Sequence, residues 1–206
     1  MLSESVYVEP ILITFNELRP LYEVRKDSIQ RRIAELRKGW TKSDEGVFAE
    51  LCYCILIAGT GAKKTIQVVD ALEKERLLFQ GSRQKIKQYM QDNACNCSGD
   101  KLEYILKWRE QFSNKGYIRI KKELEDRFLK QNGWDIHGAR EYLVSLNEEI
   151  EKGGIGWKVA SQFLRNVGIG LGHNIAVLDT HIRKDLDRFK YIKDISGGSL
   201  KKGKYL

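Results

Sequence analysis

The sequence predicts an all-α fold, and three observations support this. After residue 20, apolar residues recur at helical spacing through most of the chain. The two prolines, Pro10 and Pro20, both lie near the start, so long helices are permitted after them. There is no alternation of strands and helices and no internal repeat. With 206 residues, 42% of them hydrophobic, the chain can bury a substantial core as one domain or as two small lobes sharing it.

The first half of the chain is expected to be irregular or partly extended over 1–20 and then helical. Ser43 is a candidate N-cap for an apolar helix that runs as far as Gly59-Thr60-Gly61, because a serine side chain can accept a hydrogen bond from a free amide of the first turn. Amphipathic spacing predicts the other helices in this half over 19–40, 63–79 and 82–92.

The second half begins with an expected loop, NACNCSGD (93–100). Helices are then predicted over 101–112, 120–133, 139–152 and 157–168. A glycine-rich loop, an apolar run IAVL and a helix DTHIRKDLDRF follow, and the tail SGGSLKKGKYL resembles a serine-capped helix that has just begun.

The formal net charge of +8 is consistent with an anionic partner or with a surface kept soluble by excess lysine. Charge alone does not distinguish nucleic acid from a membrane surface or an acidic protein. The longest apolar run, LCYCILIAG (51–59), is far shorter than the roughly 20 residues of a membrane-spanning helix. The first ten residues lack the basic stretch and apolar core of a secretory signal. We therefore expect an intracellular, cytoplasmic protein.

The four cysteines form two C-x-C pairs, Cys52/Cys54 and Cys95/Cys97. On a helix, residues two apart point away from each other, so the first pair is poorly placed to chelate one ion. Core packing is the favoured interpretation for Cys52 and Cys54, and no metal site is predicted.

The segment GGIG (153–156), between two predicted helices, admits several interpretations. A dinucleotide fingerprint needs a preceding strand and a third glycine, and a P-loop needs a different spacing. A glycine C-cap with a short turn and no ligand is possible. So is a tight hairpin whose free amides, together with the start of the next helix, bind an anion such as a nucleic-acid phosphate.

Lys158 favours the functional interpretation of this hairpin. It lies in the first turn of the next helix, where the helix dipole disfavours a positive charge. This position, together with partial burial, would favour the unprotonated amine that a lysine nucleophile needs. If the helix starts at 157, Ala160, Phe163, Leu164 and Val167 face the core, whereas Lys158 lies off that stripe.

Asp179 is a candidate partner for Lys158. It follows the apolar run and precedes a predicted helix, so it is first of all a good N-cap. A carboxylate fixed at a helix N-terminus can also stabilise a developing cation or activate water.

The order of these motifs resembles a known family. The segments ELCYCILIA (50–58), KLEYI (101–105), REYLV (140–144), GGIGWKVASQFLRNVG (153–168) and IAVLDTHI (175–182) are similar, in that order, to the type-2 8-oxoguanine DNA glycosylase/AP lyases. These enzymes belong to the helix-hairpin-helix superfamily of base-excision DNA glycosylases. The resemblance implies a two-lobed helical fold over 26–206, with the hairpin at about 140–168 and residues 1–25 as an N-terminal extension.

The resemblance also implies roles for individual residues. Lys158 would attack C1′ of the damaged nucleotide and form a Schiff base, and Asp179 would stabilise positive charge on the sugar. Gly154, Ile155 and Gly156 would present amides to a backbone phosphate. Trp157 and Phe163 are candidate base-pocket aromatics, although core packing is an equal alternative for Trp157 and the favoured one for Phe163. No cofactor is expected, because the four cysteines of an iron–sulfur cluster are absent after Asp179.

The predicted function is excision of 8-oxoguanine from duplex DNA in base excision repair, with strand cleavage by β-elimination. The predicted partner is double-stranded DNA containing a damaged base, bound by a monomer. The family continues beyond the segment similar to SLKKGKYL, so the resemblance implies that the printed sequence lacks the family's C-terminal segment, which helps to recognise the oxidised guanine. The alternatives are a glycosylase for another lesion, such as an oxidised pyrimidine, and a non-catalytic helix-hairpin-helix DNA-binding module.

Overall fold

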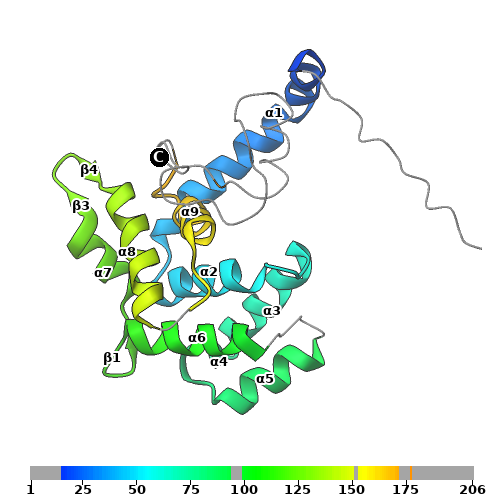
Figure 1. Ribbon diagram of the computed structural model, residues 1–206. Coiled ribbons are helices and arrows are strands. Elements are labelled where there is room, and N and C mark those ends of the chain that lie inside the picture. The colour runs from blue at the N-terminus through cyan, green and yellow to red at the C-terminus, as the bar shows by residue number, and fades with distance from the viewer. Residues whose placement is uncertain (1–14, 94–98, 151–152, 172–176, 178–206) are drawn as a thin grey trace, which may run out of the picture. The chain divides into compact units, whose positions relative to one another are not determined.

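The computed structural model describes residues 15–93, 99–150, 153–171 and 177 (Figure 1). Their elements are, in chain order, α1 (Phe15–Arg37), a 3-10 turn η1 (Gly39–Thr41), α2 (Asp44–Leu56), α3 (Ala62–Lys74), α4 (Leu77–Gln80), α5 (Arg83–Asp92), α6 (Gly99–Phe112), β1 (Ser113–Asn114), β2 (Tyr117–Ile118), α7 (Ile120–Phe128), β3 (Leu129–Lys130), β4 (Gly133–Trp134), α8 (Ile136–Glu149) and α9 (Trp157–Asn166). The mostly helical fold predicted from the sequence is confirmed.

Helix α1 begins earlier than the sequence pattern predicted. The expectation of irregular chain over 1–20 is wrong for residues 15–20, because α1 starts at Phe15 and contains Pro20. Pro20 is the sixth residue of α1 and has no N–H to donate to the Asn16 carbonyl, so α1 lacks one of its backbone hydrogen bonds there. The chain divides into two compact units, 1–35 and 36–206, so the boundary predicted after residue 25 lies inside α1. The end of the proposed N-terminal extension stays a prediction.

Helix α2 supplies much of the core of the second unit. Its N-cap is Ser43, as predicted, and the Ser43 hydroxyl accepts a hydrogen bond from the Gly46 amide over 3.2 Å. Cys52 and Cys54 are buried, which confirms that this pair packs in the core. Burial raises the pKa of both thiols, so neither is disposed to react as a thiolate. Cys95 and Cys97 lie outside the described residues.

The carboxyl end of α2 is capped by a lysine from a helix that is distant in the sequence. Lys101, near the start of α6, is 8% exposed, and its Nζ donates hydrogen bonds to the carbonyl oxygens of Leu56 (2.9 Å) and Ala58. These carbonyls have no partner within α2, and the helix dipole favours a cation there. Lys101 therefore joins α6 to the end of α2.

Two β-hairpins interrupt the helical pattern, and the sequence analysis missed both. Strands β1 and β2 pair antiparallel, Ser113 opposite Ile118. The turn between them places Lys115 and Gly116 at φ values of 51° and 83°, as a tight hairpin requires. The second hairpin, β3–β4, ends the helix predicted over 120–133 at Phe128, with Gly133 at a φ of 110°. The helix predicted over 63–79 is likewise divided into α3 and α4, at Arg76, whose φ is 57°.

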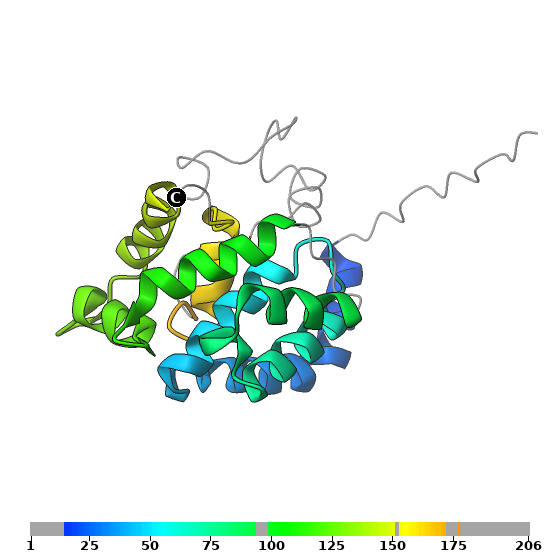
Figure 2. The same cartoon turned by 90° about the horizontal axis from the view of Figure 1, so that it is seen from below.

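Within the second unit, α9 lies beside α8 and α2, which come from distant parts of the sequence (Figure 1). The view turned by 90° shows α5 and α6 side by side (Figure 2). The core between these helices includes Phe48, Leu72, Trp108, Leu143 and Phe163, all fully buried. Among the helices in the described ranges, none has both the length and the apolar character needed to cross a bilayer.

Candidate active site

The predicted hairpin joins α8 to α9, and Gly154 is the residue that makes its turn possible. Gly154 has a φ of 79°, a left-handed conformation that strains any residue with a Cβ. A Cβ at this position would also lie 2.4 Å from Cδ2 of Tyr104, on α6. Both the backbone conformation and the close approach of the Tyr104 ring therefore require glycine.

Helix α6 holds the hairpin at a second point. The indole Nε1–H of Trp108 donates a hydrogen bond to the Gly153 carbonyl over 2.7 Å, and both residues are buried. A Cβ on Gly153 would lie 2.4 Å from the same Nε1 atom. Tyr104 and Trp108 are one helical turn apart, so they face the hairpin together. This support was not predicted from the sequence, in which its only signal is the i, i+4 spacing of Tyr104 and Trp108.

Ile155 anchors the hairpin from the inside. Its side chain is fully buried, and its amide donates a hydrogen bond of 2.7 Å to Oδ1 of Asn147, on α8. Of the three residues predicted to present amides to a phosphate, Ile155 thus has its amide engaged within the chain. The amides of Gly154 and Gly156 have no acceptor among the described residues, and Gly156 is exposed. Within the described part of the chain, nothing competes with an anion for these two N–H groups.

Helix α9 has the buried face that its sequence predicts. Ala160, Leu164 and Val167 are fully buried, and so is Phe163. Because Phe163 is 0% exposed, its ring contributes no accessible surface to a base pocket in this structure. Trp157, the other candidate aromatic, is half-buried at the first position of the helix.

Lys158 lies in the first turn of α9 and is exposed, so the partial burial expected from the sequence is not observed. That turn contains no acidic residue, and the N-cap, Gly156, provides no side-chain hydrogen bond. Among the described residues, Lys158 has no ion-pair partner. The result is an exposed primary amine that directly follows the hairpin and has no ion-pair partner in the ranges that the structure describes.

Lys63 provides an internal comparison for Lys158. It also is exposed and occupies the second position of its helix, α3, after a glycine N-cap, Gly61. A lysine at the start of a helix is therefore not in itself the distinguishing feature of this site. What distinguishes Lys158 is the hairpin before it, held by α6 and α8.

Arg140 is a residue of the site that the sequence analysis did not identify. It belongs to α8 and is 0% exposed, and its guanidinium carbon lies 5.1 Å from the centroid of the Trp157 ring. A single sequence carries no signal that separates a buried arginine from the more common surface one. Asp179, the predicted partner of Lys158, lies outside the described residues.

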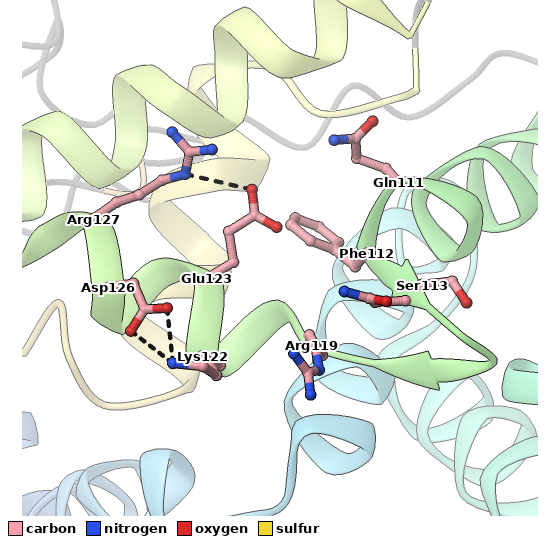
Figure 3. A pocket seen from close by; sticks show the side chains of 9 residues that line it. Gln111, Phe112, Ser113, Arg119, Lys122, Glu123, Asp126 and Arg127 are labelled. Atoms are coloured by element: carbon pink, nitrogen blue, oxygen red, sulfur yellow. Dashed lines mark hydrogen bonds and ion pairs between the residues drawn. The ribbon is translucent and has the colours of Figure 1, made fainter.

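A separate cavity of about 440 Å³ lies between the end of α6, the first β-hairpin and α7 (Figure 3). Ion pairs within α7 occupy much of its charged wall. Lys122 Nζ is 2.8 Å from an Asp126 oxygen, and Arg127 Nε is 3.4 Å from a Glu123 oxygen. Neither Lys158 nor the hairpin at 153–156 lines this cavity, so it is distinct from the candidate active site.

Comparison with known proteins places most of the chain in one family. The family model described as 8-oxoguanine DNA glycosylase matches residues 29–206. The chain is 33% identical to an 8-oxoguanine DNA glycosylase/AP lyase of Methanocaldococcus jannaschii over 181 residues, which are 88% of this chain and 76% of that protein. A protein of the same description from Fusobacterium nucleatum is 27% identical, over 88% of this chain and 77% of its own length.

Solved structures agree with these sequence matches. The crystal structure of the 8-oxoguanine DNA glycosylase of M. jannaschii is similar with a TM-score of 0.71 and 29% identity, over 92% of this chain and 78% of that one. The M. jannaschii 8-oxoguanine glycosylase/lyase in complex with a 15mer DNA containing 8-oxoguanine gives a TM-score of 0.69 and 28% identity, over 91% of this chain and 82% of that one. The chain therefore belongs to the 8-oxoguanine DNA glycosylase family.

Proposed function

We propose that the chain is a bifunctional 8-oxoguanine DNA glycosylase and AP lyase, with Lys158 as the nucleophile. The observation that carries this proposal is the exposed Lys158 amine, which directly follows the glycine hairpin and has no ion-pair partner among the described residues. Family membership supplies the reaction class. Residues 26–206 are the proposed glycosylase domain, and 1–25 the extension before it.

The reaction has three stages: loss of the base, opening of the sugar ring and cleavage of the strand. The neutral amine of Lys158 attacks C1′ of the damaged nucleotide, and the bond from C1′ to the base breaks as the base leaves with the electron pair. Opening of the sugar ring then gives a Schiff base between C1′ and Nζ. Loss of a proton from C2′ expels the 3′ phosphate by β-elimination and cuts the strand. In this proposal the Asp179 carboxylate stabilises the positive charge that develops on the sugar.

The hairpin binds the DNA backbone in this proposal. The amides of Gly154 and Gly156, together with the N-terminus of α9, suit a phosphate oxygen, because a helix start carries partial positive charge. Ile155 contributes by holding the turn through its buried side chain and its hydrogen bond to Asn147. A phosphate bound here would place the neighbouring nucleotide close to Lys158.

The proposed substrate is double-stranded DNA with one oxidised guanine, bound by a single copy of the chain. The net charge of +8 favours binding to the polyanion, and the M. jannaschii relative has been crystallised with DNA containing 8-oxoguanine. The target nucleotide must leave the base stack to reach Lys158. Trp157, half-buried beside Lys158, is the proposed aromatic contact for the flipped nucleotide.

A single-turnover assay on a duplex with one 8-oxoguanine tests the proposal. With protein in excess, free 8-oxoguanine and a cut strand should appear together without alkali treatment, and an otherwise identical undamaged duplex should stay intact. Release of an oxidised pyrimidine but not of 8-oxoguanine would reassign the lesion. Salt-sensitive DNA binding without release of any base would reject the enzyme and leave a DNA-binding module.

A further inference from the structure

Arg140 occupies a position at which an arginine is costly. It lies on the core-facing side of α8, between Ala139 and Leu143, and it is 0% exposed, as are both of these neighbours. Removing a guanidinium from water is unfavourable unless the buried charge makes compensating interactions. A leucine or methionine could fill such a position without that cost. The charge at this position therefore calls for a role beyond filling space.

One contact of the guanidinium reaches the start of α9. Its carbon lies 5.1 Å from the centroid of the Trp157 ring, within the range of a cation–π interaction. One of its terminal nitrogens is 3.4 Å from Nδ1 of His137, one turn earlier on α8. The cation–π interaction between Arg140 and Trp157 is stronger when the cation is buried than when it is exposed to water. The pair therefore forms a directional contact between α8 and the first residue of α9.

The first turn of α9 has few stabilising features of its own. Its N-cap is a glycine without a side-chain hydrogen bond, and no acidic residue balances the helix dipole. Lys158 adds a positive charge where the dipole disfavours one. Helix ends with these features tend to fray. A frayed turn would spread the position of the Lys158 amine over many conformations, although attack on C1′ needs one narrow geometry.

We propose that Arg140 is a positioning residue for Lys158. By holding the Trp157 ring against α8, it keeps the first turn of α9 formed and the Lys158 amine in place for attack on C1′. Arg140 itself does not touch the DNA, because its side chain is fully buried. This inference rests on the proposed function, in which Lys158 is the nucleophile.

The test is a double-mutant cycle on Arg140 and Trp157, read as the single-turnover rate constant for 8-oxoguanine release at saturating protein. Arg140→Met should lower this rate constant by about tenfold or more, because misplacing a reacting group has effects of that size. The dissociation constant for the duplex should change by less than about twofold, since phosphate contacts dominate affinity. Arg140→Lys keeps a cation near the ring and should recover part of the rate.

The coupling between the rate effects of the Arg140 and Trp157 substitutions shows whether Arg140 positions Lys158 or only stabilises the protein. In a Trp157→Ala background, Arg140→Met should have little further effect on the rate constant, because both substitutions remove the same contact. Melting temperatures identify the variants that are folded at the assay temperature. If Arg140→Met does not fold, the cycle is run with Arg140→Lys and Trp157→Phe, and their rate effects should again be non-additive.

Two results would overturn the inference: a wild-type rate constant for a folded Arg140→Met variant, or effects of the two substitutions that multiply independently. Failure of the proposed function itself gives a different pattern. In that case the wild-type protein would not release 8-oxoguanine, or Lys158→Gln would release it as fast as the wild type.

Discussion

Oδ1 of Asn147 accepts a hydrogen bond from the backbone amide of Ile155 over 2.7 Å. This hydrogen bond links the last turns of α8 to the hairpin, eight residues later. The hairpin amides of Gly154 and Gly156 have no acceptor in the described part of the chain. The conformation of the hairpin is thus set by side chains from both of its neighbours, Asn147 on α8 and Trp108 on α6. A phosphate would meet a turn that is already formed.

Removal of the Asn147 acceptor should destabilise the protein. Asn147→Ala leaves the partly buried Ile155 amide unpaired, which is expected to lower the free energy of unfolding by about 1–2 kcal/mol. Asn147→Asp keeps an acceptor oxygen at the same place and is the matched control. Urea unfolding at neutral pH measures both variants. Equal unfolding midpoints for Asn147→Ala and the wild type would show that this hydrogen bond does not hold the hairpin.

Alanine at two neighbouring glycines should have different consequences. Gly154→Ala places a Cβ at a φ of 79° and 2.4 Å from the Tyr104 ring, and it should cost about 2–4 kcal/mol of stability. Gly156 has a φ of −95° and open space around a Cβ. Gly156→Ala should therefore cost no more than about 1 kcal/mol, mainly because alanine is a poorer N-cap than glycine. Thermal unfolding compares them, and similar losses for the two variants would contradict the geometry described for the turn.

The stability of the protein should depend on pH through Glu73, on α3. Partial burial raises the pKa of the Glu73 carboxyl above its ordinary value of 4.5. The folded state then holds this proton more tightly than the unfolded chain does, so stability falls as pH rises from the unfolded pKa to the folded one, and the loss is complete above that interval. Glu73→Gln removes the charge and should melt at a higher temperature than the wild type at pH 7.

The stabilisation by Glu73→Gln should disappear below pH 4.5, where Glu73 is protonated in both states of the wild type. Glu75→Gln removes the same charge from an exposed position at the end of the same helix and serves as the control. A melting-temperature difference between Glu73→Gln and the wild type that is equally large at acidic and neutral pH would show that burial of this carboxylate is not the cause.

The sequence alone was sufficient to predict structural features that depend only on residues close together in the chain. Ser43 as an N-cap and the buried stripe of α9 follow from cap chemistry and helical spacing, and both are observed. The second β-hairpin also had a local signal, Asn132-Gly133, but the amphipathic pattern of α7 before it obscured that signal. The break at Arg76 had none, since an arginine with a φ of 57° is not indicated by its residue type.

The supports of the candidate site could not be predicted from one sequence, because they depend on contacts between helices that are distant along the chain. Trp108 contacts Gly153 from 45 residues away, and the burial of Arg140 becomes visible only when α8 is packed. The sequence did locate the hairpin and Lys158, since glycine spacing and the position of a lysine in a helix are local features. The catalytic roles of Lys158 and Asp179 stay predictions.

The central claim is that Lys158 forms a covalent intermediate with DNA, and borohydride trapping tests it most directly. A duplex with one 8-oxoguanine is incubated with an excess of wild type, Lys158→Gln or Lys63→Gln, which replaces an exposed lysine at the equivalent position of α3. We predict a covalent adduct with the wild type and with Lys63→Gln, and none with Lys158→Gln, although that variant still binds the duplex. Trapping with an abasic duplex alone would keep the lyase and reject 8-oxoguanine as the substrate. An undiminished adduct with Lys158→Gln, or no adduct of the wild type with either duplex despite binding, would contradict the claim.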